Sequence, residues 1–288
     1  MTSPHQPHET VPAQAMERSN QSIEVELITQ AIYLKYGYDF RDYSRAAIQR
    51  RLLLRLEKEG LANLSALLHR LLYEPRFFAQ ILGDFSINVT EMFRDPAFYL
   101  SLKTKVLPEL GQRPQLKVWH AGCGSGEEVY SLAILFKEAG LYDRTQFYAT
   151  DINRTVLDKA RNGEIPIREL KNYSANYLRA GGETSLTDHL LLQAGTARIR
   201  PDLLANILFS DHNLAHDQVF GEMDLILCRN VLIYFNQKLQ NKVLQLFRDS
   251  LRPGGFLGLG MKEDLSFADS RNDFTPLPDK VHLYQRKQ

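Results

Sequence analysis

The chain contains 288 residues, of which 44% are hydrophobic and 24% are charged, and these fractions are typical of a globular protein. They exclude wholesale disorder and a fibrous repeat, and the length is enough for one large domain or two modest ones. The 35 basic and 34 acidic side chains give a net charge of +1, so the overall charge indicates neither a nucleic-acid partner nor an anionic membrane. Any charged docking surface must therefore be local.

The cysteine content and the hydrophobic runs indicate where the protein works. The two cysteines, Cys123 and Cys228, are too few for a disulfide framework or a zinc site with four cysteine ligands. No run approaches about 18 consecutive apolar residues, and the first residues lack the charged and apolar regions of a signal peptide. We expect a cytoplasmic protein with no bound metal, no membrane insertion and no nucleic-acid partner.

The first 85 residues divide into a polar tail and a helical part. Residues 1–21 are rich in proline and polar side chains and poor in apolar ones, which predicts a flexible tail. Apolar side chains at spacings of three and four, with glycine stop signals, then predict helices from Ser22 to about Gly37 and over Tyr43–Glu59, Leu64–Tyr73 and Phe77–Phe85. We interpret residues 22–85 as an N-terminal helical module and residues 86–115 as a linker.

The second of these helices is strongly basic. Between Arg41 and Lys58 there are six basic side chains and two acidic ones. A solvated helix face would explain this excess, and so would a surface that docks an acidic partner. In the second case, Arg50, Arg51 and Arg55 are the candidate docking residues.

From Leu116 onward, short apolar runs alternate with helical segments, which predicts βα units around a mainly parallel sheet. The expected strands are Leu116–His120, Gln146–Thr150, Ile207–Ser210, Asp224–Cys228, Phe256–Gly260 and His282–Gln285. The expected helices are Glu128–Ala139, Arg154–Arg161 and Lys238–Leu251, and Pro253-Gly254-Gly255 should turn the chain into the strand that follows. Between about residues 177 and 206 the alternation stops, and His189–Gln193 and Thr196–Arg200 predict a small antiparallel β insert. We therefore expect an α/β domain over residues 116–288.

A glycine-rich turn connects the first expected strand of this domain to its first helix. Gly122, Gly124 and Gly126 let the backbone bend tightly and approach a ligand that a side chain would block. A dinucleotide site would need a glycine where Glu127 stands, and the adjacent carboxylates of Glu127 and Glu128 would repel a pyrophosphate. A P-loop is excluded because no Gly-Lys-Ser/Thr follows. The turn therefore favours a cationic or zwitterionic nucleoside.

Asp151 stands at the end of the second expected strand. A carboxylate in this place of an α/β fold can accept hydrogen bonds from both hydroxyls of a ribose. The alternative is that Asp151 caps the helix that follows. The spacing from the glycine-rich turn favours ribose binding.

Four features together make the chain similar to methyltransferases that use S-adenosylmethionine. They are the glycine-rich turn, Asp151, Phe209-Ser-Asp-His-Asn-Leu214 and Leu251-Arg-Pro-Gly-Gly255. Four motifs narrow this likeness. They are Asn88-Val-Thr-Glu-Met-Phe-Arg94, Gly126-Glu-Glu-Val-Tyr-Ser131, Asn213-Leu214 and Cys228-Arg-Asn-Val-Leu-Ile-Tyr-Phe235. In order and spacing they resemble the CheR family of chemotaxis receptor methyltransferases, over about residues 22–288.

The resemblance implies a Rossmann-like methyltransferase fold, S-adenosylmethionine as cofactor and S-adenosylhomocysteine as product. It also implies that residues 86–115 contact the cofactor. The cofactor contacts that it implies are Asn88, Thr90, Arg94, Gly122, Gly124, Glu128, Asp151, Asn213, Leu214, Cys228 and Arg229.

Particular roles follow from the same resemblance. Asn213 would read adenine through its amide, and Leu214 would pack against the base. Glu128 would meet the cationic groups of the cofactor, although a carboxylate there could instead cap its helix. Arg94 would clamp the methionyl or acceptor carboxylate, and with Tyr234 it would orient the acceptor as a catalytic residue.

Other interpretations of two residues remain to be weighed. Tyr234 could be an aromatic side chain packed in the core with a satisfied hydroxyl. Cys228 could suggest a nucleophile, but no proline precedes it and it ends an apolar strand, so a small buried residue with a backbone contact is the better interpretation.

The chain departs from the family pattern at two places. The family often has Ser-Thr-Gly or Ser-Ser-Gly before the paired glutamates, whereas this chain has Gly124-Ser-Gly126. We expect cofactor binding to survive that change. The glycine-rich run of family members that bind a receptor tail is not reproduced at Gly181-Gly182. The sequence therefore does not support receptor-tail tethering through the β insert.

The expected activity is methylation of glutamate side-chain carboxylates on the cytoplasmic helices of methyl-accepting chemoreceptors, which gives glutamate methyl esters. The alternative from another class is a non-catalytic sensor that binds the cofactor or its product and docks on a partner. A small-molecule or RNA methyltransferase is a further alternative. The absence of Asp/Asn-Pro-Pro-Tyr/Phe and Pro-Cys sequences argues against amino-group and ring-carbon chemistry.

Overall fold

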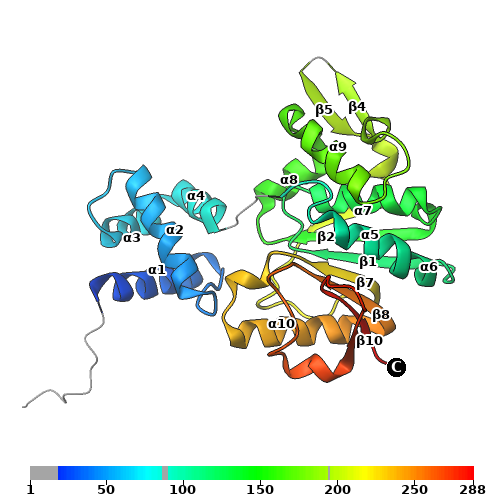
Figure 1. Ribbon diagram of the computed structural model, residues 1–288. Helices are drawn as coiled ribbons and strands as arrows, with labels where there is room; N and C mark the ends of the chain where they lie inside the picture. Colours follow the sequence, from blue (N-terminus) through cyan, green and yellow to red (C-terminus); the bar gives the residue numbers. More distant parts are fainter. Residues whose placement is uncertain (1–18, 86–89, 194) are drawn as a thin grey trace, which may run out of the picture.

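The protein forms a small helical module beside a larger α/β domain (Figure 1). The structure is a computed structural model, and it describes residues 19–85, 90–193 and 195–288. Most of the predicted flexible tail and Asn88 lie outside the described residues. Within those residues, no helix has the length and apolar character needed to cross a bilayer.

The N-terminal module packs its helices around one apolar core. The helices are α1 (Asn20–Tyr36), α2 (Arg45–Lys58), α3 (Leu64–Tyr73) and α4 (Pro75–Phe85). Ser19 caps α1 by accepting a hydrogen bond from the Ser22 N–H, so this helix begins two residues earlier than predicted. Ile28, Leu52, Leu67 and Ile81 meet in the core and are almost fully buried. The prediction of a helical module is confirmed.

The second helix begins at Arg45, two residues after the start predicted at about Tyr43, and the reason lies in the other domain. Tyr43 forms an isolated antiparallel bridge with Phe235, and the Ser44 N–H donates to the Tyr234 carbonyl at 2.7 Å. Asn236 N–H donates to the Asp42 carbonyl at 2.9 Å. These pairings hold the segment before α2 in an extended conformation against the α/β domain.

The α/β domain is built on a seven-stranded sheet with the order β6-β2-β1-β7-β8-β10-β9. The first five strands in this order are parallel, and β10 and β9 are antiparallel to their neighbours. The strands are β1 (Leu116–Ala121), β2 (Thr145–Asp151), β6 (Ile207–Asp211), β7 (Met223–Cys228), β8 (Leu251–Leu259), β9 (Phe274–Pro276) and β10 (Leu283–Arg286). The predicted mainly parallel sheet is confirmed.

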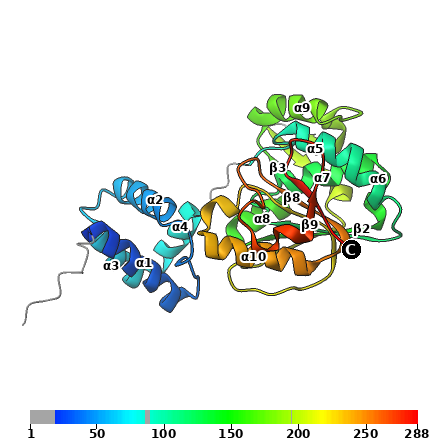
Figure 2. The ribbon, with the colours of Figure 1, turned by 60° about the horizontal axis from the view of Figure 1, so that its bottom comes forward.

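Helices cover both faces of this sheet (Figures 1 and 2). Val118 and Leu225 point to one face, where they share a core with α7 (Glu127–Glu138) and α8 (Arg154–Asn162). Trp119 and Ile226 point to the other face and pack with α10 (Gln237–Ser250). Because side chains alternate along a strand, the apolar runs of β1 and β7 supply both cores.

From residue 90 onward, where the structure describes it, the segment predicted as a linker is partly helical. It contains α5 (Pro96–Ser101), a π-helical turn (Leu102–Val106) and α6 (Leu107–Leu110). Phe98, Tyr99 and Leu102 are fully buried in the core on the α7 face. The segment therefore belongs to the α/β domain.

The turn at Pro253-Gly254-Gly255 lies within β8 and not before it. Met223 pairs with Leu251 while Leu225 pairs with Phe256, so the register shifts around the turn as in a β-bulge. Gly254 has a φ of +71°, a conformation that a residue without a Cβ adopts without strain. The strand therefore begins five residues earlier than predicted.

The predicted β insert is present but begins earlier than about residue 177. Its three-stranded antiparallel sheet has the order β3-β5-β4, formed by β3 (Glu164–Ile165), β4 (Leu190–Gln193) and β5 (Thr196–Ile199). Between β3 and β4 lies α9 (Leu170–Arg179), which the sequence did not predict. The hairpin of β4 and β5 is confirmed.

Candidate active site

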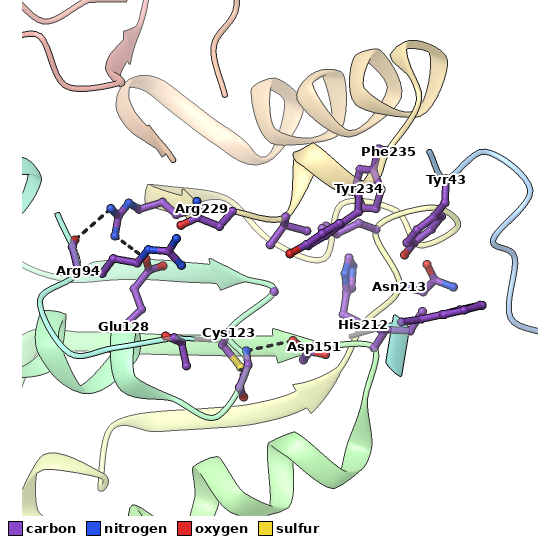
Figure 3. A pocket seen from close by; sticks show the side chains of 18 of the residues that line it. Tyr43, Arg94, Cys123, Glu128, Asp151, His212, Asn213, Arg229, Tyr234 and Phe235 are labelled. Carbon is purple, nitrogen blue, oxygen red and sulfur yellow. Dashed lines mark hydrogen bonds and ion pairs between the residues drawn. The ribbon is translucent and has the colours of Figure 1, made fainter. Parts of the chain in front are cut away.

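A pocket lies at the carboxyl ends of β1, β2 and β7 (Figure 3). The carboxyl ends of parallel strands form the usual ligand crevice of an α/β sheet, because the loops that follow the strands diverge there. The residues predicted from the sequence that line this pocket are Thr90, Arg94, Gly122, Gly124, Glu128, Asp151, Asn213, Leu214, Arg229 and Tyr234. Side chains predicted from four separate motifs are thus brought together.

The glycine-rich turn forms the floor of the pocket after β1. Gly122 has a φ of +81°, and its N–H donates to the Thr150 carbonyl at 2.8 Å. A Cβ at Gly122 would lie only 2.4 Å from the Val231 side chain. The turn therefore needs glycine both for its backbone conformation and for its close contact with the loop after β7.

Asp151 ends β2 and is held by backbone groups on both sides. Its Oδ2 accepts from the Gly124 N–H at 3.0 Å, and its Oδ1 accepts from the Asn153 N–H at 2.9 Å. Burial raises the pKa of this carboxyl, and the backbone N–H groups of Asn153, Gly124 and Ile152 oppose that rise. Asn153, not Asp151, is the N-cap of α8, because its side chain accepts from the Thr155 N–H. The capping alternative for Asp151 is therefore wrong.

Glu128 lies in the first turn of α7 beside two basic groups. Its Oε2 is 3.0 Å from Nη1 of Arg229, and its Oε1 is 3.5 Å from Nδ1 of the fully buried His120. Burial alone would raise the pKa of Glu128, but His120 and Arg229 outweigh this effect and lower it. Glu128 is therefore held as a carboxylate at the pocket wall, where it can face a cationic ligand group.

Arg229 acts mainly by holding other residues. Its Nη2 donates to Oδ2 of Asp95 at 2.7 Å and to the Arg94 carbonyl at 3.1 Å, while its guanidinium lies over the Phe98 ring. Its side chain is only 1% exposed. It thus connects Glu128 to the segment that carries Arg94 (Figure 3).

Tyr234 lies across the pocket, where the module meets the α/β domain. Its carbonyl accepts from the Ser44 N–H, and the guanidinium of Arg51 lies over its ring at 4.9 Å from the centroid. Tyr234 is half-buried and lines the pocket, so it is not simply a core aromatic. The helical module therefore supports one of the two predicted catalytic side chains.

The loop after β6 forms the end of the pocket farthest from Arg94 (Figure 3). Asn213 lines this end of the pocket, and its Oδ1 accepts from the Ala215 N–H at 3.0 Å. Leu214 is almost fully buried at the same end. His212 packs edge-to-face against Trp119, and burial lowers its pKa, so its ring is neutral at pH 7.

Comparison with known proteins identifies the chain. Residues 88–281 match the family described as CheR methyltransferase, SAM binding domain, and residues 23–86 match the CheR methyltransferase all-alpha domain. The chain belongs to the CheR methyltransferase family. It is a methyltransferase that uses S-adenosylmethionine as cofactor.

Two relatives illustrate the range of similarity. A Pseudomonas putida protein named as a methyltransferase, Cher3, is 45% identical over 267 residues, which cover 93% of this chain and 98% of the relative. The chemotaxis protein methyltransferase of Escherichia coli is 31% identical over 250 residues, which cover 85% of each chain. The likeness therefore spans both the module and the α/β domain.

The docking face predicted for this CheR methyltransferase is corrected by the structure. Arg51 and Arg55 are buried inside the module, so they do not form an exposed docking face with Arg50. Arg51 donates to the carbonyl of Phe85, and Arg55 pairs with Asp84 at 2.5 Å. Both arginines are used to join α2 to α4, and only Arg50 of the three is exposed.

Cys228 is the small buried residue that the sequence favoured, and its contact with the cofactor stays a prediction. It is fully buried at the end of β7 and is not among the residues that line the pocket. Burial raises the pKa of its thiol well above the usual value, which argues against a nucleophilic thiolate. Cys228 therefore lies beneath the pocket.

Several pocket residues were not predicted from the sequence. They are Tyr43, Phe85, Glu91, Cys123, Ile152, His212, Asn230, Val231 and Phe235. Cys123, His212 and Asn230 stand inside motifs that were already recognised, so adjacency to those motifs was an available signal. Tyr43 and Phe85 come from the module, more than 100 positions before Phe235, and only the folded chain brings them to the pocket.

Proposed function

We propose that this CheR methyltransferase methylates glutamate side-chain carboxylates on the cytoplasmic helices of methyl-accepting chemoreceptors, forming glutamate methyl esters and S-adenosylhomocysteine. The observation that carries the proposal is that Arg94 and Tyr234 line the same pocket as the glycine-rich turn and Asp151. An acceptor carboxylate can therefore be oriented where the cofactor is held. The names of the Escherichia coli relative and of a Salmonella typhimurium relative, both chemotaxis protein methyltransferases, support the choice of substrate.

The described residues fit S-adenosylmethionine. Asp151 can accept from the ribose hydroxyls, since its two oxygens have more lone pairs than the N–H groups of Gly124, Asn153 and Ile152 occupy. Asn213 and Leu214 would hold the adenine. Glu128, kept ionised by Arg229, would pair with the amino group of the methionyl part. The glycine turn admits the ligand because side chains are absent there.

When bound, S-adenosylmethionine supplies an electrophilic methyl group on a sulfonium centre. An acceptor glutamate has an unperturbed pKa of about 4.3, so it is ionised at pH 7 and needs no strong general base. Arg94 would bind the methionyl or acceptor carboxylate with its planar fork, and Tyr234 would orient the acceptor from the opposite side. Neither residue is required to move a proton. Positioning thus accounts for the greater part of the rate.

Docking of the receptor on the module is a separate part of the proposal. Arg50 is exposed on α2, the helix that also bears Arg51 beneath Tyr234. A basic side chain in this place would attract the acidic surface of a receptor helix toward the pocket. Arg50 is therefore the remaining candidate docking residue of the three that the sequence suggested.

The product distinguishes this proposal from other methyl-transfer activities. The protein is incubated with methyl-labelled cofactor and membranes that contain chemoreceptors, and the labelled receptor is then treated with mild alkali. Esters hydrolyse readily, so the label should leave as volatile methanol in proportion to its incorporation. Base-stable label would contradict the glutamate acceptor. Tight binding of S-adenosylhomocysteine without any incorporation would favour the sensor alternative.

A further inference from the structure

The loop that follows β7 has an unusual backbone for its place in the pocket wall. Three consecutive motif residues, Arg229, Asn230 and Val231, line the pocket together with Tyr234. Asn230 adopts a φ of +62°, which is uncommon for a residue with a side chain and costs energy unless the surroundings hold it. The backbone N–H groups of this loop also need acceptors, because it lies against the domain interior.

One carboxylate supplies these acceptors. Glu263, which follows β8, accepts from the Asn230 N–H at 2.8 Å and from the Gly260 N–H at 2.7 Å through Oε2. Its Oε1 accepts from the Ile233 N–H at 3.3 Å. The residue is only 5% exposed. A single side chain thus ties both ends of the Asn230–Tyr234 loop to the end of the neighbouring strand.

Gly260 is part of the same arrangement. A Cβ at this position would lie 2.6 Å from Oε2 of Glu263 and 2.8 Å from the Asn230 nitrogen. Both distances are shorter than normal contacts, so only glycine permits the carboxylate and the loop to approach as they do. The close approach at Gly260 therefore indicates that the contact between Glu263 and the loop is built into the fold.

Not every buried carboxylate of the domain accepts hydrogen bonds from backbone N–H groups alone, as Asp224 shows. Asp224, at the other end of β7, accepts from the Lys117 N–H at 2.8 Å but also pairs with Arg113 and Arg252. In the described part of the chain, the hydrogen-bond partners of the Glu263 carboxylate are backbone N–H groups of the pocket loop and of Gly260. Asp224 stabilises the sheet, whereas Glu263 fixes the shape of the pocket wall.

We propose that Glu263 is a positioning residue for methyl transfer, because it holds the Asn230–Tyr234 loop in the geometry that presents Tyr234 to the acceptor. This inference rests on the proposed function. Glu263→Gln keeps the size of the side chain but replaces one acceptor oxygen with an amide that faces a backbone N–H. The loop should then shift at one end while the glycine-rich turn and Asp151 stay in place.

The test compares Glu263→Gln with wild type in receptor methylation and in calorimetric binding of S-adenosylhomocysteine. We expect kcat to fall by about tenfold or more, with affinity for S-adenosylhomocysteine changed by less than about threefold. Asp224→Asn is the matched control, since it also alters a buried carboxylate that accepts a backbone N–H. It should lower the melting temperature and leave kcat of the folded protein within about twofold.

Gly260→Ala disturbs the contact between Glu263 and the Asn230–Tyr234 loop in a second way. It should also lower kcat while affinity for S-adenosylhomocysteine changes little. In a Tyr234→Phe background, Glu263→Gln should cost less than it does in wild type, because the two residues act through one geometry. Additive losses, an unchanged kcat for folded Glu263→Gln, or equal losses for Glu263→Gln and Asp224→Asn would overturn the inference alone. Wild-type protein that binds S-adenosylhomocysteine but methylates no receptor would overturn the proposed function, and this inference with it.

Discussion

The two walls of the pocket are built in different ways. The wall formed by the α/β domain uses residues that lie within a few positions of strand ends, such as Gly122, Gly124 and Asp151, and backbone hydrogen bonds fix them. The wall formed by the module uses Tyr43 and Phe85, and the edge of the Tyr43 ring meets Phe235 at a centroid distance of 4.8 Å. The first wall follows from local sequence, while the second exists only when two domains pack. We expect the first to control cofactor affinity and the second to control access of the acceptor.

The largest effect should come from replacing Asp151, the carboxylate in the pocket wall that the α/β domain forms. Asp151→Ala should abolish measurable binding of S-adenosylhomocysteine, because two ribose hydrogen bonds to a charged acceptor contribute about 1.5 to 3 kcal/mol each. Calorimetry measures the affinity, and a thermal melt checks that the fold remains. Asp211→Ala is the matched control, since Asp211 pairs in register with Asp151 at the end of the neighbouring strand but is exposed. Equal affinities for the two variants would remove Asp151 from the site.

The difference between the walls also explains how much the sequence could predict. Gly122 to Glu128 and Asp151 lie beside one another in a βα unit, so the pattern of strand, turn and helix was enough to place them. The roles of Arg51 and Arg55 were mispredicted because a count of charges cannot show which face of a helix is covered. Both are buried, and their charge is offset by carbonyl and carboxylate groups of α4, a helix about 30 positions away.

The next largest effect should come from the ion pair between Arg229 and Glu128, in the pocket wall that the α/β domain forms. Arg229→Met should destabilise the protein by about 3 to 5 kcal/mol, because Glu128 and Asp95 would lose their buried cationic partner. It should also make cofactor binding more sensitive to acid. The pKa of Glu128 is lowered in wild type partly by Arg229, so without Arg229 the carboxylate gains a proton at a higher pH and loses its attraction for a cation.

Thermal melts and binding of S-adenosylhomocysteine at several pH values measure these two effects. As the pH falls, the affinity of the variant should begin to decline at a higher pH than the affinity of wild type. Arg154→Met serves as the control, since Arg154 pairs with Asp211 on the surface with 74% of its side chain exposed. A variant at Arg229 that behaves like Arg154→Met would contradict the role assigned to the buried pair.

A moderate loss of stability is expected when the contacts between α2 and α4, which support the module's wall of the pocket, are removed. Arg55→Ala should destabilise the protein by about 1.5 to 3 kcal/mol, because the hydrogen bonds of this buried guanidinium join α2 to Asp84 and Gln80 of α4. Phe85, the next residue of α4, lines the pocket, so receptor methylation should fall in parallel. Affinity for S-adenosylhomocysteine should change much less than in Asp151→Ala. A loss of affinity as large as that of Asp151→Ala would mean that the two walls are not separable.

The smallest effect should appear at Arg50, on the outer surface of the same helix. Arg50→Glu should leave the melting temperature and the affinity for S-adenosylhomocysteine unchanged, since Arg50 is exposed and lies outside the pocket. If it attracts an acidic receptor helix, reversal of its charge should slow methylation at low salt, by an amount on the order of 1 kcal/mol in apparent binding. The gap between variant and wild type should close as salt rises, because exposed charges are screened over about 8 Å at physiological ionic strength. Lys280→Glu makes the same change in charge at an exposed position near β10 and should have no such effect. If Arg50→Glu and Lys280→Glu slow methylation equally, the overall charge of the protein matters and α2 carries no docking surface.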